Sequence, residues 1–265
     1  MRKSITYRSL TLSYRIEGKG TPVLLLHGFA EDGSIWDPPL AALKKSHLLV
    51  IPDLPGSGQS SPLSGPATLE ELADYIKAII DTEEITQCIL IGHSMGGYIT
   101  LAFAEKYPGR LKALGLFHSI AFADSEEKKA GRQKSIEFIR KNGAPAYIRQ
   151  STPNLFSDHS RKEHPEWITS LTDRYATSIP PDSLVYYQQA MINRPDRSHV
   201  LAQFPNPVLF IIGRQDNIIP LDASLRQTHI PALSHIHLLE NSGHMGMLED
   251  SAASQDILDD FLRAY

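Results

Sequence analysis

The sequence predicts an α/β fold: a mostly parallel β-sheet flanked by helices, with an inserted helical segment. Three observations support this prediction. Short continuous apolar runs recur along the chain, as expected of strands that are buried on both faces of a sheet. Stretches with helical spacing separate these runs, which indicates strand–helix–strand units. The alternation stops between residues 121 and 204, where helical patterns and prolines occur without a convincing strand.

The strands are predicted from two kinds of pattern. Residues 4–17 alternate apolar and polar positions, which predicts a hairpin of two half-exposed strands. Strands buried on both faces are predicted at six later apolar runs, residues 23–26, 48–51, 88–91, 113–117, 208–212 and 236–239. Because ligands bind at the carboxyl ends of parallel strands, we expect the functional residues directly after these runs.

Helices are predicted between the strands, at residues 34–45, 68–81, 95–107 and 251–263. Thr68 precedes the second of these helices, and Glu70 and Glu71 follow it. A polar residue at the N-terminus with acidic residues in the first turn satisfies free N–H groups and suits the helix dipole. The same pattern therefore predicts where this helix begins.

Residues 121–204 are predicted to form a helical cap on a core of residues 1–120 and 205–265. A charged helical stretch at residues 126–141 and six prolines fall in this segment. Its length and its position favour a cap over ordinary surface helices. The candidates for lining a substrate pocket are Phe138, Tyr147, Phe156, Trp167 and Tyr187, although these side chains could instead dock the cap onto the core.

The composition of this 265-residue chain excludes several function classes. Its 26 basic and 30 acidic residues are nearly balanced and form no long run of one sign, which argues against a nucleic-acid partner. The one cysteine, Cys88, precludes an intrachain disulfide and falls in a predicted strand, where a small core residue is expected. The sequence has neither a signal-peptide pattern nor the roughly 20 apolar residues that cross a bilayer. We therefore expect a cytoplasmic protein without a membrane partner.

The segment Gly92-His93-Ser94-Met95-Gly96 carries the main functional signal. It lies between a predicted strand and a predicted helix, and a serine at such a junction is typical of a nucleophile on a sharp turn. Flanking glycines permit this turn because it crowds the backbone. The N-terminus of the next helix would face an anion formed at the serine. The alternative is a turn whose serine only caps the helix.

A serine nucleophile needs a base that accepts its proton and a group that orients this base. His244 follows the last apolar run, and Asp216 follows the run before it, so both are expected at the same sheet edge as Ser94. The chain order of serine, acid and histidine, each after a separate strand, is typical of a catalytic triad. Asp124, which follows another strand, is the alternative acid.

Negative charge that develops on a substrate carbonyl oxygen needs hydrogen-bond donors. The backbone N–H of Met95 is one candidate, since it follows the serine. The N–H of Phe29, in the loop His27-Gly28-Phe29, is the second. Gly28 permits close approach of the backbone, but the loop could also be a simple glycine turn that His27 holds by hydrogen bonds.

No metal or organic cofactor is indicated. His235 and His237 could share one strand face, but no third ligand stands nearby, so packing is favoured over a metal site. Residues 53–60 contain glycines but lack the Gly-Lys-Ser/Thr ending of a phosphate loop, and we interpret them as a structured turn. No residue of the cap is predicted to bind a charged substrate group, and three of its arginines are expected to be solvated: Arg140, Arg149 and Arg174.

With these motifs together, the chain resembles the α/β-hydrolase superfamily from about residue 20 to the C-terminus. The resemblance is carried by residues 27–29, 53–60, 92–97, 213–216 and 243–244. It implies an eight-stranded sheet in which only the second strand is antiparallel, with the cap after the sixth strand.

The resemblance also implies a carboxylesterase-like enzyme. Such an enzyme would cleave a small carboxylic ester through an acyl-enzyme intermediate, with Ser94, Asp216 and His244 as its triad. Carbon–carbon bond hydrolases, perhydrolases and menaquinone-pathway lyases share the serine elbow and remain alternatives. Carbon–carbon bond hydrolysis is less favoured than ester hydrolysis, because those hydrolases often have tryptophan after the histidine and this chain has Met245. A ligand receptor of the same fold with slow turnover is a further alternative.

Overall fold

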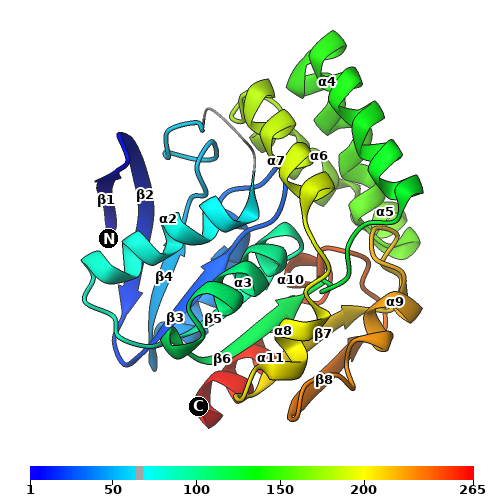
Figure 1. Ribbon diagram of the computed structural model, residues 1–265. Helices are drawn as coiled ribbons and strands as arrows, with labels where there is room; N and C mark the ends of the chain where they lie inside the picture. The colour runs from blue at the N-terminus through cyan, green and yellow to red at the C-terminus, as the bar shows by residue number, and fades with distance from the viewer. Residues whose placement is uncertain (64–67) are drawn as a thin grey trace.

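The computed structural model describes residues 1–63 and 68–265, which form a layered α/β fold (Figure 1). Its eight-stranded sheet has the order β1-β2-β4-β3-β5-β6-β7-β8. The strands are β1 (Arg2–Tyr7), β2 (Leu10–Gly18), β3 (Thr21–Leu26), β4 (His47–Pro52), β5 (Cys88–His93), β6 (Leu111–Phe117), β7 (Val208–Gly213) and β8 (Ser234–Leu239). β2 is antiparallel to β1 and β4, and the remaining neighbours pair in parallel. The predicted fold class is therefore confirmed.

Helices cover both faces of the sheet, and each face has its own apolar core. One face packs against α2 (Leu69–Thr82), α3 (Met95–Lys106) and α8 (Ser198–Gln203). The other packs against α1 (Asp37–Leu43), α10 (Gly246–Glu249) and α11 (Ser251–Ala264). α2 begins where the sequence predicts, since the Thr68 hydroxyl accepts a hydrogen bond of 3.1 Å from the Glu71 N–H. Burial also raises the pKa of the Cys88 thiol to about 12, as expected of a core residue.

Two predicted elements differ from the structure. The helix expected at residues 34–45 is divided into a 3₁₀ turn, Gly33–Trp36, and α1. α1 begins there because Pro38 and Pro39 lie in its first turn, where a missing N–H costs no hydrogen bond. The strand expected to be buried at residues 236–239 is an edge strand, β8, with a neighbour on one side only. The side chain of Ile236 is 49% exposed there, so an apolar run did not imply burial on both faces.

Most of the helices between β6 and β7 lie together beside the carboxyl ends of the parallel strands (Figure 1). They are α4 (Glu126–Ser151), α5 (Asp158–Glu163), α6 (Pro165–Tyr175) and α7 (Pro181–Asn193), followed by α8 beneath. α4 packs against α7. It contains a kink at Gly143, whose φ of 81° and ψ of 168° are not helical, just before Pro145. The helix predicted at residues 126–141 therefore ends at this kink, and a second helical segment follows it within α4.

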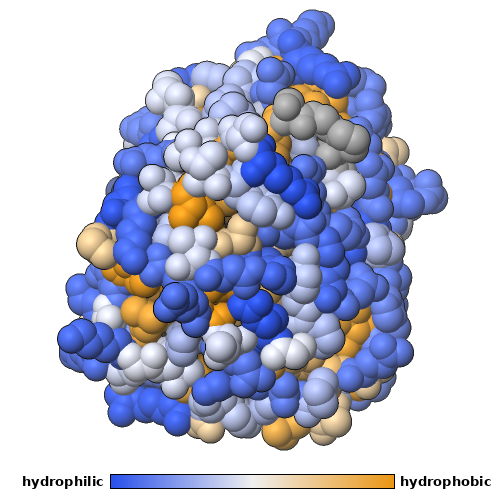
Figure 2. Space-filling model, turned by 60° about the vertical axis from the view of Figure 1, so that its left-hand side comes forward, coloured by the Kyte–Doolittle hydropathy of each residue, from blue (hydrophilic) through white to orange (hydrophobic). Residues whose placement is uncertain are grey.

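The surface drawn in Figure 2 is mostly hydrophilic, and its hydrophobic residues lie in small separate groups. Such scattered groups are ordinary on a folded protein and mark no interface by themselves. Among the described residues, no helix is both long and apolar enough to cross a membrane.

Candidate active site

Ser94 lies on a strained turn between β5 and α3. Its φ of 49° and ψ of −115° are unusual for a residue with a side chain. A Cβ atom added at Gly92 would lie 2.2 Å from the carbonyl of Gly96, and one added at Gly96 would lie 2.5 Å from the Leu26 carbonyl oxygen. The turn therefore needs both glycines. The Ser94 hydroxyl makes no capping hydrogen bond to α3, which contradicts the interpretation of this serine as only a helix cap.

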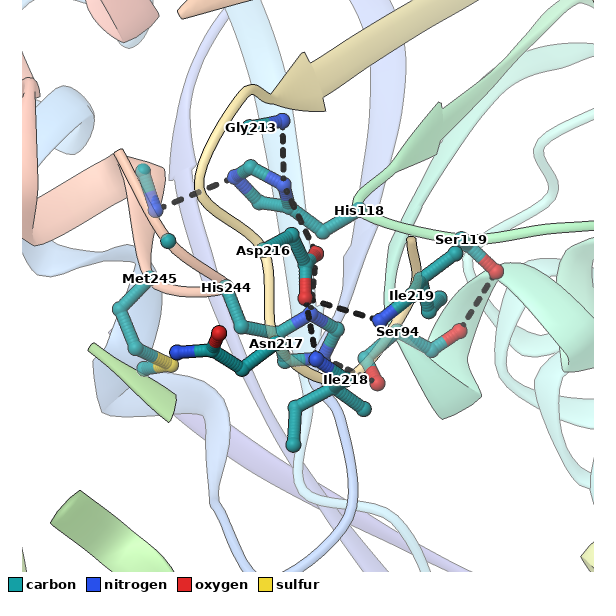
Figure 3. A network of polar contacts seen from close by, with 12 residues as sticks. Ser94, His118, Ser119, Gly213, Asp216, Asn217, Ile218, Ile219, His244 and Met245 are labelled. Atoms are coloured by element: carbon teal, nitrogen blue, oxygen red, sulfur yellow. Dashed lines mark hydrogen bonds and ion pairs between the residues drawn. The ribbon is translucent and has the colours of Figure 1, made fainter. Parts of the chain in front are cut away.

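Three side chains from separate strand ends form a continuous hydrogen-bonded chain (Figure 3). The Ser94 Oγ lies 2.8 Å from Nε2 of His244. Nδ1 of the same ring donates to Oδ2 of Asp216 over 2.7 Å. The imidazole can therefore accept the serine proton at Nε2 while its Nδ1–H stays bonded to the carboxylate.

Asp216 is held as a carboxylate. Its Oδ1 accepts hydrogen bonds from the N–H groups of Ile218 and Ile219, at 2.8 and 2.9 Å. Burial by itself would raise its pKa, but the adjacent imidazoles of His244 and His118 outweigh burial and hold the pKa of Asp216 well below its usual range. The rival acid, Asp124, accepts hydrogen bonds from Arg132 and Arg194 instead.

The loop after β3 lies against the serine. A Cβ atom added at Gly28 would lie only 3.2 Å from Cβ of Ser94, so glycine permits this approach. His27 holds the loop, because its Nδ1 donates to the Gly28 carbonyl over 2.9 Å and its Nε2 accepts from the Leu54 N–H over 2.9 Å. Within the described part of the chain, the N–H groups of Phe29 and Met95 donate to no other group. Both donors are thus available to a ligand.

A buried ion pair beneath this loop was missed in the sequence. Glu31 Oε2 accepts from the Gly28 N–H over 2.7 Å and lies 3.0 Å from Nδ1 of His93. Nε2 of His93 lies 2.9 Å from the His244 carbonyl oxygen. Both ring nitrogens face acceptors, so the ring is an imidazolium. Burial opposes both charges, but their mutual attraction raises the pKa of His93 and lowers that of Glu31. The pair connects the loop, the serine turn and the histidine loop.

His118, the residue after β6, was also missed. Its Nδ1 lies 3.5 Å from Oδ2 of Asp216 and 3.1 Å from the Gly213 nitrogen, and its Nε2 accepts from the Gly246 N–H over 3.2 Å. Burial lowers the pKa of His118 to about 4, despite the nearby carboxylate. The ring is therefore neutral at pH 7. The only signal in the sequence was its place after a strand.

The neutral state of His118 predicts a pH-dependent contribution to stability. An unfolded histidine titrates near ~6.5, so between about pH 6.5 and 4 the unfolded chain binds a proton that the folded protein does not. The free energy of unfolding should fall by about 3 kcal/mol across this window as the pH decreases. Urea denaturation at several pH values should show that the free energy of unfolding depends less on pH in His118→Asn than in the wild-type protein. An unchanged pH slope in that variant, with the exposed His159→Asn as control, would contradict this prediction.

His118, Asp216 and His244 are close enough to one another to share a metal ion, since their ligand atoms lie within 4.8 Å. The same atoms are already hydrogen-bonded within the protein. A metal would have to displace these bonds, and we assign the cluster to hydrogen bonding instead. His235 donates to or accepts from the Tyr265 hydroxyl at 2.8 Å and packs edge-on against Phe261, which fits a packing role.

A cavity of about 580 Å³ opens onto the serine and the histidine. Residues from α4, α6 and α7 form much of its wall. Of the five aromatic candidates, Phe138 and Tyr147 line it, and Phe156, Trp167 and Tyr187 do not. Phe156 is fully buried in the core, and Trp167 stacks on His164. The Tyr187 hydroxyl is bonded to the Pro55 carbonyl, so this side chain docks α7 onto the core.

The family follows from a comparison with known proteins. A family model described as "alpha/beta hydrolase fold" matches residues 21–251. The chain belongs to the α/β-hydrolase fold family.

Several relatives of this α/β hydrolase are named enzymes. It is 29% identical to the 2-hydroxymuconate semialdehyde hydrolase of Pseudomonas sp. strain CF600, over 92% of this chain and 88% of that protein. It is also 29% identical to Lipase 1 of Psychrobacter immobilis, over 94% and 81%. The structure of a thermophilic esterase from Thermogutta terrifontis matches with a TM-score of 0.93 and 29% identity, over 100% of this chain and 98% of that one. The prediction that the chain is a hydrolytic enzyme is confirmed.

Proposed function

We propose that this α/β hydrolase is a serine esterase that cleaves a small carboxylic ester, with Ser94, His244 and Asp216 as its catalytic triad. The observation that carries the proposal is the unbroken hydrogen-bonded chain from the serine hydroxyl to the buried carboxylate, at the wall of a cavity. A nucleophile, a base within contact range and an oriented base are the requirements of acyl transfer.

In the first step, Ser94 Oγ attacks the ester carbonyl while His244 Nε2 takes the hydroxyl proton. The imidazolium that forms is stabilised by Asp216 and returns the proton to the departing alcohol. Water then repeats the sequence on the acyl-enzyme and releases the carboxylic acid. Because the carboxylate stays charged throughout, it orients the ring and compensates its charge.

We assign the backbone N–H groups of Phe29 and Met95 to the oxyanion. Met95 opens α3, so its N–H is among the free donors at the positive end of the helix dipole. The loop of Phe29 approaches the serine closely because Gly28 lacks a side chain. Preorganised donors of this kind stabilise the tetrahedral intermediate more than the planar ester.

We also propose that residues 121–204 act as a cap over a core of residues 1–120 and 205–265. The cavity wall supports this division, because it combines strand-end residues with residues of α4, α6 and α7. Substrate selection would then depend on the helices, and the bond-breaking step on the core.

Carbon–carbon bond hydrolysis is the second candidate. It is favoured by the 29% identity to a protein named 2-hydroxymuconate semialdehyde hydrolase. The triad would serve both reactions, so the substrate and not the triad must distinguish them. Perhydrolase, lyase and slow-turnover receptor functions have no specific observation in their favour.

A panel of 4-nitrophenyl esters with acyl chains of increasing length tests the proposed function. We expect many turnovers per active site and a maximum of kcat/KM at a short chain, because the cavity is of modest volume. The measurement is steady-state release of nitrophenol, corrected for uncatalysed hydrolysis. A single burst of one equivalent without further turnover would instead indicate a receptor that is only acylated.

A further inference from the structure

The cavity that contains Ser94 is lined by three basic residues of α4, Lys128, Arg132 and Lys134. Among the described residues, Glu31 is the one acidic residue in the same wall, and its charge is balanced by the buried His93 imidazolium. The lining therefore carries an excess of positive charge. In a partly enclosed site this excess interacts with a ligand more strongly than the same charges would on the surface.

The charge of Arg132 is only partly neutralised by its neighbours. Its Nε donates to Asp124 over 2.6 Å, and the same carboxylate accepts from Arg194 over 2.9 Å. These ion pairs outweigh burial and lower the pKa of Asp124, so it is a carboxylate shared by two guanidinium groups. Asp196 also acts on Arg194, but from the exposed surface. One positive charge thus remains in the cluster next to the cavity.

Both Arg132 and Lys128 keep hydrogen-bond donors free. Arg132 Nη1 donates to Gln188 over 3.1 Å, and its Nη2 has no partner among the described residues. The side chain of Arg132 lines the cavity and is 14% exposed. Lys128 donates one hydrogen bond, of 3.1 Å, to the Ile218 carbonyl, and forms no ion pair in the described part of the chain. An ammonium has three donors, so two remain.

Lys128 is connected to the proposed triad through one residue, Ile218. The carbonyl that it binds belongs to Ile218, whose N–H donates to Asp216. Ile218, Ser94 and His244 line the same cavity. A ligand anion on Lys128 would therefore share this cavity with an ester carbonyl at Ser94.

We propose that the substrate is an ester that carries a carboxylate, which Lys128 and Arg132 bind while the ester carbonyl lies at Ser94. This inference rests on the proposed function. It differs from the expectation from sequence that no cap residue binds a charged group. Arg140, Arg149 and Arg174 are exposed, as expected, whereas the side chain of Arg132 is only 14% exposed and is paired with Asp124.

The experiment compares esters matched in size and different in charge. One pair is 4-nitrophenyl adipate half-ester and 4-nitrophenyl heptanoate, with the charge on the acyl side. The other is 4-acetoxybenzoate and its methyl ester, with the charge on the alcohol side. We expect that in one of the two pairs the charged ester has a kcat/KM about 10–100-fold higher than that of its neutral counterpart, the range typical of charged hydrogen bonds. The pair that shows the difference identifies the side of the ester that carries the carboxylate. The ratio within a pair is the readout, so partial loss of folded enzyme cancels.

The variants Lys128→Gln and Arg132→Gln should each lower this ratio about tenfold or more, and Arg132→Lys should lower it less because the charge remains. Lys129→Gln is the matched control, since Lys129 is bonded to Glu126 and does not line the cavity. Turnover of the neutral esters with no preference for charge would overturn the inference and leave the esterase function standing. If none of the four esters were hydrolysed, both the inference and the proposed esterase function would be overturned. A ratio that is high but unchanged in Lys128→Gln and Arg132→Gln would also overturn it.

Discussion

Replacement of Ser94 by alanine is expected to lower kcat for ester hydrolysis by about 10⁶-fold, to a small residual rate. The variant retains the elbow and both proposed oxyanion donors, since alanine differs only by the hydroxyl. It lacks the atom that forms the acyl-enzyme, and His244 Nε2 loses its 2.8 Å partner. Water at the same position would have to act as the nucleophile. The residual rate reflects binding and the oxyanion donors alone.

The loss must be shown to arise from the nucleophile. A fluorophosphonate probe should label the wild-type protein at Ser94, as peptide mass mapping can establish, and should fail to label Ser94→Ala. Ser46→Ala is a matched control, because the Ser46 hydroxyl also contacts a histidine ring, that of His47, at 3.0 Å. Ser46 precedes β4 and His47 begins it, so this pair lies at the opposite end of the strand from the site. Labelling of a different serine, or full activity in Ser94→Ala, would contradict the proposed mechanism.

The convergence of the three proposed triad residues was predictable because their positions follow from the order of the strands. In a parallel sheet all carboxyl ends meet at one edge, so a serine, an acid and a histidine that each follow an apolar run converge there. Ser94, Asp216 and His244 follow β5, β7 and β8, and their side chains do lie within hydrogen-bonding distance. Local pattern and topology were sufficient for this inference.

The supporting polar groups were not predictable in the same way. Glu31 and His93 are 62 residues apart, and nothing in either local pattern indicates that they form a buried ion pair. Burial of a charged group is determined by tertiary packing, which no periodicity describes. The same holds for the cavity wall. Trp167 and Tyr187 are of the aromatic type expected in a pocket. Helix packing instead places Trp167 on His164 and Tyr187 against the core.

Asp216→Asn should lower kcat by about 10⁴-fold, which is the largest effect expected of a substitution that removes no reacting atom. The structure gives the reason. Oδ1 of Asp216 accepts from two backbone N–H groups, at 2.8 and 2.9 Å, so the oxygen of an asparagine would occupy that side. Its NH₂ group would then face His244 Nδ1, which must become an acceptor. The proton moves to Nε2, and this nitrogen can no longer accept one from Ser94.

The change of tautomer should lower kcat with little change in KM, because the cavity wall is unaltered. Steady-state kinetics on a short-chain ester measures both, and urea denaturation checks that the variant is folded. Asp222→Asn is the control, since it makes the same change of charge on an exposed residue of α9 (Leu221–Arg226). Asp124→Asn tests the rival acid. If Asp124→Asn abolished turnover and Asp216→Asn did not, Asp124 would be the acid that orients the base, and the hydrogen bond between Asp216 and His244 would be structural only.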